Sequence, residues 1–129
     1  QDFLTEMVNE IMSMGPYFRA VVDSFDFFMQ REDPSRVVAM LRMMQAHTQL
    51  NRGILFITVS NDTITPAIKQ EMAAIADMVC DFKVRTVGSD FETSMIVSKF
   101  RNAPENLSIM VYRVTPEEGI TPETVERIA

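Results

Sequence analysis

The first residues of the chain alternate between apolar and polar side chains with the period of an α-helix. Between Asp2 and Met14 an apolar residue returns every three or four positions, and Glu6 and Glu10 lie on the opposite side of the predicted helix. Gly15-Pro16 follows directly, and this pair is typical of a helix end. The pattern therefore predicts an amphipathic helix over residues 2–14.

Two further helices begin with the same kind of signal. A capping residue, a proline at the first helical position and then spaced apolar side chains occur from Asp33-Pro34 to about Gln49, and again from Thr65-Pro66 to about Ala76. Proline is favoured at that position because the first backbone N–H groups of a helix have no partner inside the helix. We predict helices over both stretches.

Short, nearly continuous apolar runs predict two strands, at residues 19–22 and 54–59. Runs of this kind are typical of strands covered on both faces, and a helix lies between them in the sequence, so a parallel βαβ unit is expected. Residues 23–29, which follow the first strand, are rich in aromatics and are interpreted as a loop. Residues 60–63 are polar and are expected to form a loop after the second strand.

The last third of the chain has a different pattern. Strand-like stretches occupy residues 78–85, 93–101 and 107–115, and short turns separate them, so we expect an antiparallel hairpin or meander added to the parallel sheet. Thr121-Pro122-Glu123 is interpreted as the start of a last helical turn. No stretch has the composition of a linker. The fold class is therefore predicted as α/β, with residues 1–129 forming a single domain or a fragment of one.

Composition excludes several classes of function. The chain has 129 residues, of which 47% are hydrophobic, and 12 basic residues stand against 18 acidic ones, giving a net charge of -6. This balance disfavours a broad nucleic-acid interface, and the apolar runs are far shorter than the ~20 residues that span a bilayer.

A single cysteine, Cys80, fits a reducing, cytoplasmic setting. The only histidine, His47, has no partner at metal-ligand spacing. Because the chain starts at Gln1, we expect a piece of a longer protein.

Polar residues follow both predicted parallel strands. Asp23 and Ser24 come directly after the first strand, at the edge where open α/β sheets bind ligands. Thr58, Ser60 and Asn61 end the second. Each set also fits ordinary turn chemistry, since Ser, Asn and Asp bind their own backbone in loops. Asp26 is interpreted as a solvated loop carboxylate without a role.

Lys99 and Arg101 form a second candidate set. Alternation on a strand places their side chains on one face and Phe100 on the other. Two cations on one face suit a phosphate group, because guanidinium offers a planar fork of donors and ammonium a point charge. A solvated strand face explains the same pattern.

The order of these elements resembles the carboxyl-terminal half of a RecA-superfamily ATPase, most closely the KaiC-like branch. Four stretches of sequence carry the resemblance: Val21-Val22-Asp23-Ser24, Gly-Ile-Leu-Phe-Ile-Thr at 53–58, Ala-Asp-Met-Val at 76–79 and Ser-Lys-Phe-Arg at 98–101. The resemblance implies that Asp23, with Ser24 beside it, belongs to a Walker B strand and holds Mg²⁺ through water. It implies that Thr58, Ser60 or Asn61 senses the terminal phosphate. It also implies that Lys99 and Arg101 reach a neighbouring subunit's nucleotide.

The loop that binds phosphates in this superfamily has no counterpart here. The four glycines do not form a G-x-x-x-x-G-K-S/T sequence, so no nest of backbone N–H groups for phosphates is expected. We expect ATP and Mg²⁺ to bind the intact parent, and this chain alone to be inactive. In the family sheet, the missing strand lies between those matching 54–59 and 78–85. The expected partners are therefore the missing amino-terminal half or further copies in a homo-oligomer.

Two alternatives remain open from the sequence. The first alternative is a non-catalytic regulatory or assembly module that uses the RecA-like scaffold without the phosphate loop. If the resemblance of the Asp23 strand is accidental, the chain is a generic doubly wound α/β binding domain.

Overall fold

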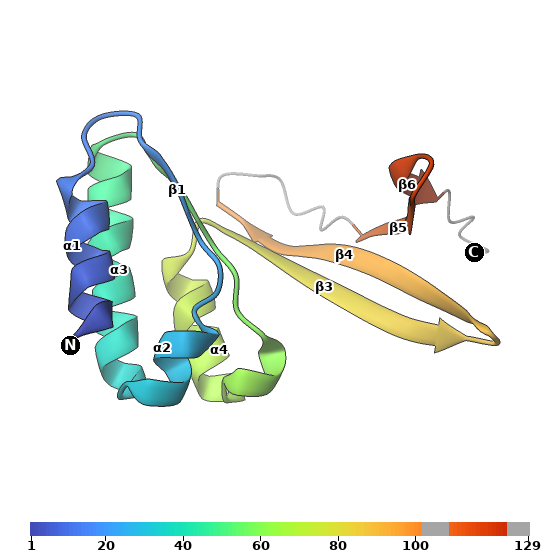
Figure 1. Ribbon diagram of the computed structural model, residues 1–129, viewed down its shortest axis with the longest axis horizontal. Helices are drawn as coiled ribbons and strands as arrows, with labels where there is room; N and C mark the ends of the chain where they lie inside the picture. Colours follow the sequence, from blue (N-terminus) through green and yellow to red (C-terminus); the bar gives the residue numbers. More distant parts are fainter. Residues whose placement is uncertain (102–108, 124–129) are drawn as a thin grey trace. The chain divides into compact units, whose positions relative to one another are not determined.

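The computed structural model describes residues 1–101 and 109–123 (Figure 1). The chain divides into two compact units, Gln1–Ala76 and Asp77–Ala129. A single domain or fragment over residues 1–129 stays a prediction. In the described part of the chain, no helix combines the length and the apolar character needed to cross a membrane.

The first unit contains a pair of parallel strands and the helices that pack on them. Its elements are α1 (Phe3–Ser13), β1 (Arg19–Val22), α2 (Asp26–Arg31), α3 (Pro34–Leu50), β2 (Ile54–Ile57), the 3₁₀ turn η1 (Asn61–Thr63) and α4 (Pro66–Ile75). β1 and β2 pair in parallel with Arg19 opposite Ile54 and Val22 opposite Ile57. Because α2 and α3 lie between them in the chain, this is the predicted βαβ unit.

The three long helices begin where their capping residues predict. The carboxylate of Asp2 accepts a hydrogen bond from the Thr5 backbone N–H at 3.1 Å, and that of Asp33 accepts one from the Ser35 N–H at 2.9 Å. The hydroxyl oxygen of Thr65 accepts from the N–H of Ile68 at 3.3 Å. Each bond satisfies an N–H group that the first helical turn leaves without a partner. The predictions for α1, α3 and α4 are confirmed.

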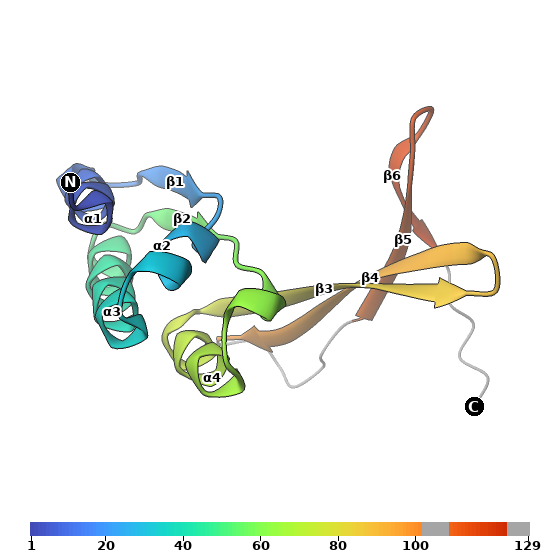
Figure 2. The same ribbon diagram turned by 60° about the horizontal axis from the view of Figure 1, so that its bottom comes forward.

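The core of the first unit lies between the helices and one face of the two strands. α1 and α3 run side by side (Figures 1 and 2). The buried residues come from all four helices and the turn before α2: Leu4, Val8, Ile11, Phe25, Phe28, Met29, Val37, Val38, Leu41, Met44 and Met72. Burial of these apolar side chains is the main stabilising contribution to the unit.

The prediction that both strands are covered on both faces is wrong. Ala20 and Leu55 pack against the core, whereas their neighbours Val21 and Phe56 are 69% and 61% exposed. Successive side chains of a strand point to opposite faces, and the helices of this unit cover only one of them. The apolar residues on the other face therefore form an exposed surface, which we call the open face: Val21, Ile54 and Phe56.

The aromatic stretch after β1 is also different from the prediction. Residues 26–31 form the helix α2 instead of a loop. Phe25, Phe28 and Met29 are buried, and the rings of Phe25 and Phe28 meet edge to face with centroids 5.7 Å apart. These apolar positions are separated by three and four residues, the spacing of one helix face.

The second unit is an antiparallel meander of four strands, which confirms this part of the predicted fold class. The strands are β3 (Met78–Val87), β4 (Asp90–Phe100), β5 (Ile109–Thr115) and β6 (Gly119–Glu123), in that spatial order. Gly88, with a φ of 64°, lies in the turn that joins β3 and β4. The sequence predicted that this meander is added to the parallel sheet. Among the described residues it instead forms a separate sheet, which is not hydrogen-bonded to the parallel pair.

The helical turn predicted at Thr121-Pro122-Glu123 is wrong, because these residues belong to β6. Gly119, with a φ of 69°, follows the turn after β5, and the chain then pairs back so that Glu123 lies opposite Val111. Pro122 is tolerated because β6 is the last strand of the sheet, where a missing N–H donor costs least.

Candidate functional site

The carboxyl ends of β1 and β2 bring together two residues from distant parts of the sequence. The Thr58 N–H donates to the Val22 carbonyl oxygen at 3.1 Å, which extends the parallel pairing by one residue beyond each strand. The Phe25 N–H donates to the Thr58 carbonyl oxygen at 2.8 Å. Thr58 is therefore held by its backbone beside the end of β1.

Asp23 and Thr58 form the centre of the candidate site. The Thr58 hydroxyl donates to Asp23 Oδ1 at 2.6 Å, and both residues are exposed at the sheet edge. Within the described part of the chain, this is the only hydrogen bond to the Asp23 side chain. The remaining oxygen Oδ2 therefore faces no protein donor there, and a carboxylate so placed can bind a cation or hydrated ligand.

Of the three candidate residues after β2, only Thr58 is hydrogen-bonded to the Asp23 side chain in the described structure. Ser60 caps η1 instead, its Oγ accepting from the Asp62 N–H at 3.4 Å, and Asn61 is an exposed residue of that turn. Ser24, the neighbour of Asp23, donates its hydroxyl to Asp26 Oδ2 at 2.8 Å. The peptide bond between Asp23 and Ser24 is cis.

The interpretation of Asp26 as a solvated loop carboxylate is wrong. Asp26 is half-buried in the first turn of α2, and its Oδ1 accepts from the Ser60 N–H at 2.8 Å and from Thr63 Oγ1 at 2.5 Å. These hydrogen bonds, that of Thr63 first, lower the pKa of Asp26 below its ordinary value, because they favour the charged carboxylate. The helical spacing of Phe25, Phe28 and Met29 is the sequence signal that would have placed Asp26 on a fixed element.

Lys99 and Arg101 lie in the second unit, at the end of β4. Lys99 is opposite Val79 and Phe100 opposite Met78, but the register shifts between Val79 and Cys80, so the regular alternation of β4 is interrupted just before Lys99. The Arg101 N–H donates to the Asp77 carbonyl oxygen at 2.8 Å, and its guanidinium forms an ion pair with the Asp77 carboxylate at 3.0 Å. That the two cations bind phosphate together stays a prediction.

The chemistry at Asp23 fits a weakly held magnesium ion. The described residues contain no group of three or more His, Cys, Asp or Glu side chains placed to hold a metal. Mg²⁺ does not require one, since it keeps several waters and often uses only one or two carboxylates together with phosphate oxygens. One exposed carboxylate beside a hydroxyl meets that requirement only when a phosphate group is bound next to it.

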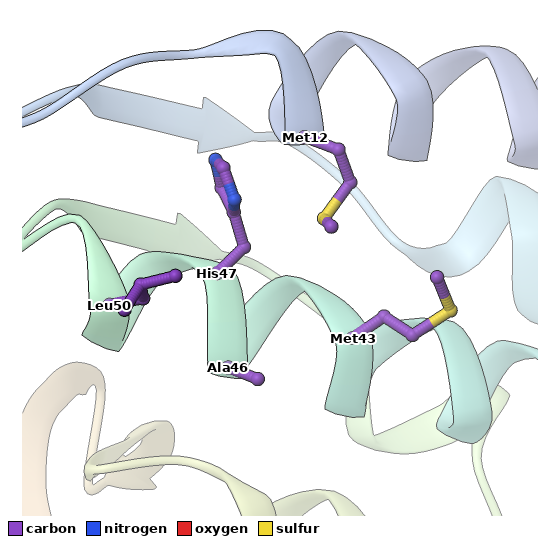
Figure 3. Close-up of a pocket in the computed structure, with 5 residues that line it drawn as sticks. All are labelled: Met12, Met43, Ala46, His47 and Leu50. Atoms are coloured by element: carbon purple, nitrogen blue, oxygen red, sulfur yellow. The ribbon is translucent and has the colours of Figure 1, made fainter.

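His47 lies in a groove on the helical side of the first unit (Figure 3). The groove, about 330 Å³ in volume, is lined by Met12, Met43, Ala46, His47 and Leu50. The His47 Nε2 is 2.9 Å from the Met14 carbonyl oxygen, and Nδ1 is 3.2 Å from the Asn51 side-chain nitrogen. Both ring nitrogens are thus engaged, and the histidine ties the end of α3 to the residue after α1.

Comparison with known proteins shows the fold of the chain. No curated protein matches it. The flagellar accessory protein FlaH from Methanocaldococcus jannaschii has a similar structure, with a TM-score of 0.70 and 18% identity over 95% of this chain and 54% of FlaH. The KaiC-like protein PH0186 from Pyrococcus horikoshii OT3 gives a TM-score of 0.64 and 14% identity, also over 95% of this chain and 54% of that one.

These similarities support the RecA/KaiC-like fold that the sequence predicts, and at such identities they support the fold alone. The chain spans about half the length of the two solved structures, as their 54% coverage shows. A protein-family model described as a family of unknown function (DUF7125) matches residues 2–112. Because that match covers most of the sequence, the chain belongs to this family.

Proposed function

We propose that this chain is part of a RecA/KaiC-like ATP-binding domain in which Asp23 is the Walker B carboxylate. The observation that carries the proposal is the 2.6 Å hydrogen bond from Thr58 to Asp23 at the carboxyl edge of two parallel strands. Ligands of open α/β sheets bind at this edge. Thr58, not Ser60 or Asn61, is then the polar residue that couples the second strand to the nucleotide.

Asp23 and Thr58 have separate tasks in this proposal. Bound Mg²⁺ would offset the charge of the phosphate oxygens of ATP, and Asp23 would hold it through its water shell. Thr58 holds the Asp23 carboxylate in one orientation by donating to Oδ1, which leaves Oδ2 directed at the ligand. Ser24 stabilises the loop after β1 through its bond to Asp26 and takes no part in binding the ion.

A complementary part of the domain is needed to supply the phosphate loop. The first unit has a surface suited to such a part: among the described residues, the two strands have unpaired outer edges, and the open face exposes Val21, Ile54 and Phe56. Unpaired edges and exposed apolar side chains both favour association with further structure. The two solved structures, which are nearly twice as long as the matched region, are consistent with this arrangement.

Lys99 and Arg101 are proposed to contact the nucleotide of a neighbouring copy in a homo-oligomer. Arg101 would then exchange its ion pair with Asp77 for a phosphate group. The exchange costs little, because an exposed ion pair contributes on the order of 0 to 1 kcal/mol.

Calorimetry on the full-length natural protein tests the proposal. We expect Mg·ATP to bind to the wild type and Asp23→Ala to abolish that binding. Asp62→Ala, which removes an exposed carboxylate from the nearby turn η1, is the matched control and should leave the affinity unchanged. Equal affinities for the wild type and Asp23→Ala would contradict the assignment of Asp23.

The second candidate function is a non-catalytic regulatory or assembly module on the same scaffold. The exposed apolar open face favours it, because such a surface suits association with a partner. It predicts that the full-length protein binds no nucleotide, and that Phe56→Glu disrupts association with its partner while Asp23→Ala does not.

A further inference from the structure

The carboxylate of Asp26 connects the two loops that flank the candidate site. Oδ2 accepts from the hydroxyl of Ser24, which follows β1, at 2.8 Å. Oδ1 accepts from the N–H of Ser60 at 2.8 Å and from the hydroxyl of Thr63 at 2.5 Å, and both of these residues follow β2. A single side chain thus joins the polar segments at the carboxyl ends of both parallel strands.

This connection is not a local turn. Ser60 and Thr63 are 34 and 37 residues away from Asp26 in the sequence, so their bonds fix one loop against the other. Asp26 itself is fixed on its amino-terminal side, because the preceding Phe25 is fully buried and the Asp26 N–H donates to Ser24 Oγ at 3.2 Å. The hydrogen bonds of Asp26 therefore couple the position of one loop to that of the other.

The hydrogen bonds of the Asp26 carboxylate to Ser24, Ser60 and Thr63, which we call the Asp26 network, involve residues next to the candidate site in the sequence. Asp23 precedes Ser24 directly, and Thr58 is two residues before Ser60. The Asp23–Thr58 hydrogen bond is consequently held from one side by the strand register and from the other by the Asp26 network. If the network were lost, the strand register and the backbone hydrogen bonds of Thr58 to Val22 and Phe25 would still hold the pair, but the loops beyond it would no longer be tied to each other.

We propose that Asp26 is a positioning residue that locks the loops after β1 and β2 so that Asp23 and Thr58 meet in the geometry required for Mg·ATP. The inference rests on the proposed function for the ligand, and on the observed hydrogen bonds for the coupling of the loops. Asp26 acts through Asp23 and Thr58 and does not touch the nucleotide or the ion.

A carboxylate suits this task better than an amide. An ionised Asp accepts at both oxygens, as all three bonds require, whereas Asn keeps one accepting oxygen and presents a donor to Ser24. A hydroxyl can rotate and accept, so Asp26→Asn keeps part of the network. Asp26→Ala removes all of it. The two substitutions therefore give graded effects.

The first experiment examines the 129-residue chain without nucleotide. Nuclear magnetic resonance spectra of the wild type, Asp26→Ala, Asp26→Asn and the control Asp62→Asn are compared at the amides of Asp23, Thr58 and Ser60. We expect large shifts at all three in Asp26→Ala, smaller ones in Asp26→Asn and none beyond the local change in Asp62→Asn. Unchanged Asp23 and Thr58 signals in Asp26→Ala would overturn the proposal.

The coupling of the loops can still be tested if the Asp26→Ala variant does not fold. If Asp26→Ala fails to fold, Thr63→Val deletes one of the three bonds to Asp26 while preserving side-chain volume, and it also removes the contact of the same hydroxyl with the Ser60 carbonyl oxygen at 2.9 Å. The informative shifts, reduced in size, are therefore those expected at Asp23 and Thr58. Their absence in a folded Thr63→Val chain would contradict the coupling.

The second experiment measures nucleotide affinity of the full-length natural protein. Loss of a group that orients a metal-binding residue typically weakens metal affinity roughly 10- to 100-fold. We expect a decrease of this size for Mg·ATP in Asp26→Ala, partial rescue in Asp26→Asn, and little change for ATP with the metal chelated. A merely structural role would weaken both forms equally, and that result would overturn the proposal.

The two experiments separate the inference from the proposed function. If the wild type binds no Mg·ATP but the Asp23 and Thr58 signals move in Asp26→Ala, the ATP-binding function fails and the coupling of the loops stands. If Mg·ATP binds through Asp23 and the signals do not move, the function stands and the positioning role fails.

Discussion

The hydroxyl of Thr58 donates a 2.6 Å hydrogen bond to the carboxylate of Asp23, although 35 residues separate them. The parallel register that places Val22 opposite Ile57 brings the two residues next to each other, because each directly follows one of that pair. The position of the candidate site thus depends on strand pairing first and on loop conformation second.

Removing the Thr58 hydroxyl should weaken this contact without disturbing the sheet. Thr58→Val keeps the branched shape favoured in strands and deletes the donor. A hydrogen bond typically contributes about 0.5 to 1.5 kcal/mol, and the exposure of both residues places this one near the lower end. Urea denaturation of the 129-residue chain should show a loss of that size. Thr58→Ser retains the hydroxyl and should lose less; an equal loss would mean that the methyl group, not the bond, is responsible.

Two phenylalanines test whether the open face is free in the isolated chain. Phe25 is fully buried, whereas Phe56 is 61% exposed. Burial determines the cost of truncation, so Phe25→Ala should lower the free energy of unfolding by about 3 to 5 kcal/mol. Phe56→Ala should lower it by well under about 1 kcal/mol, as for other exposed positions.

The same pair of variants becomes informative in the full-length protein. If a complementary part covers the open face there, Phe56→Ala should become destabilising by several times its effect in the isolated chain, while the effect of Phe25→Ala should stay similar. Thermal unfolding of both proteins measures the difference. A Phe56→Ala effect that is equally small in both would show that the open face has no intramolecular partner.

Much of the fold follows from local signals in the sequence. The helices α1, α3 and α4 were predicted because Asp2, Asp33 and Thr65 combine capping chemistry with spaced apolar residues. One prediction based on proline was wrong. Thr121-Pro122 matches the pattern of a helix start, but Pro122 lies in an edge strand, where its missing N–H is tolerated as well as it is at a helix start. Local signals cannot distinguish these cases, because the pairing of β6 with β5 is a tertiary contact.

The exposed face of the two strands and the hydrogen bonds of Asp26 could not be predicted from local sequence either, because both depend on residues that are distant in the sequence. An apolar run such as 54–57 shows that a strand suits coverage on both faces, but not whether the covering residues belong to the same 129-residue stretch. Asp26 looked unremarkable because its partners Ser60 and Thr63 are distant in sequence. Asp23 and Thr58, by contrast, were found because strand ends are visible in the sequence.

Two glycines should respond oppositely to the same substitution. A Cβ atom on Gly53 would lie 2.6 Å from a ring carbon of Phe18, whereas nothing lies within 4 Å of one on Gly15. Phe18 has little freedom to move away, because its ring stacks on His47 with centroids 5.6 Å apart. Gly53→Ala should therefore cost about 1 to 3 kcal/mol, the range for overpacking. Gly15→Ala should be neutral or slightly stabilising.

A double substitution identifies the cause of the Gly53 effect. Phe18→Leu removes the ring that the new methyl group would meet. Gly53→Ala should then cost less in the Phe18→Leu background than in the wild type, which denaturant unfolding of the four proteins measures. An unchanged cost would place the strain in the backbone instead of the ring contact.

Acid should weaken the attachment of α1 to α3 at a pH set by Asp2. Its carboxylate caps α1 through the Thr5 N–H and pairs with Arg36 at 2.6 Å. These contacts, the Thr5 bond first, lower the pKa of Asp2 from 3.8 to about 2. A pKa lowered by folding means that the contribution is complete above pH 3.8 and is lost as the pH falls toward 2. Urea unfolding at pH 7, 4 and 2.5 should therefore show a loss of stability between the last two values.

Asp2→Asn keeps an oxygen for capping but cannot ionise, so its loss over that interval should be smaller than that of the wild type. Equal losses would assign the acid sensitivity to other carboxylates, of which Asp26 is the first to examine because its pKa is also lowered.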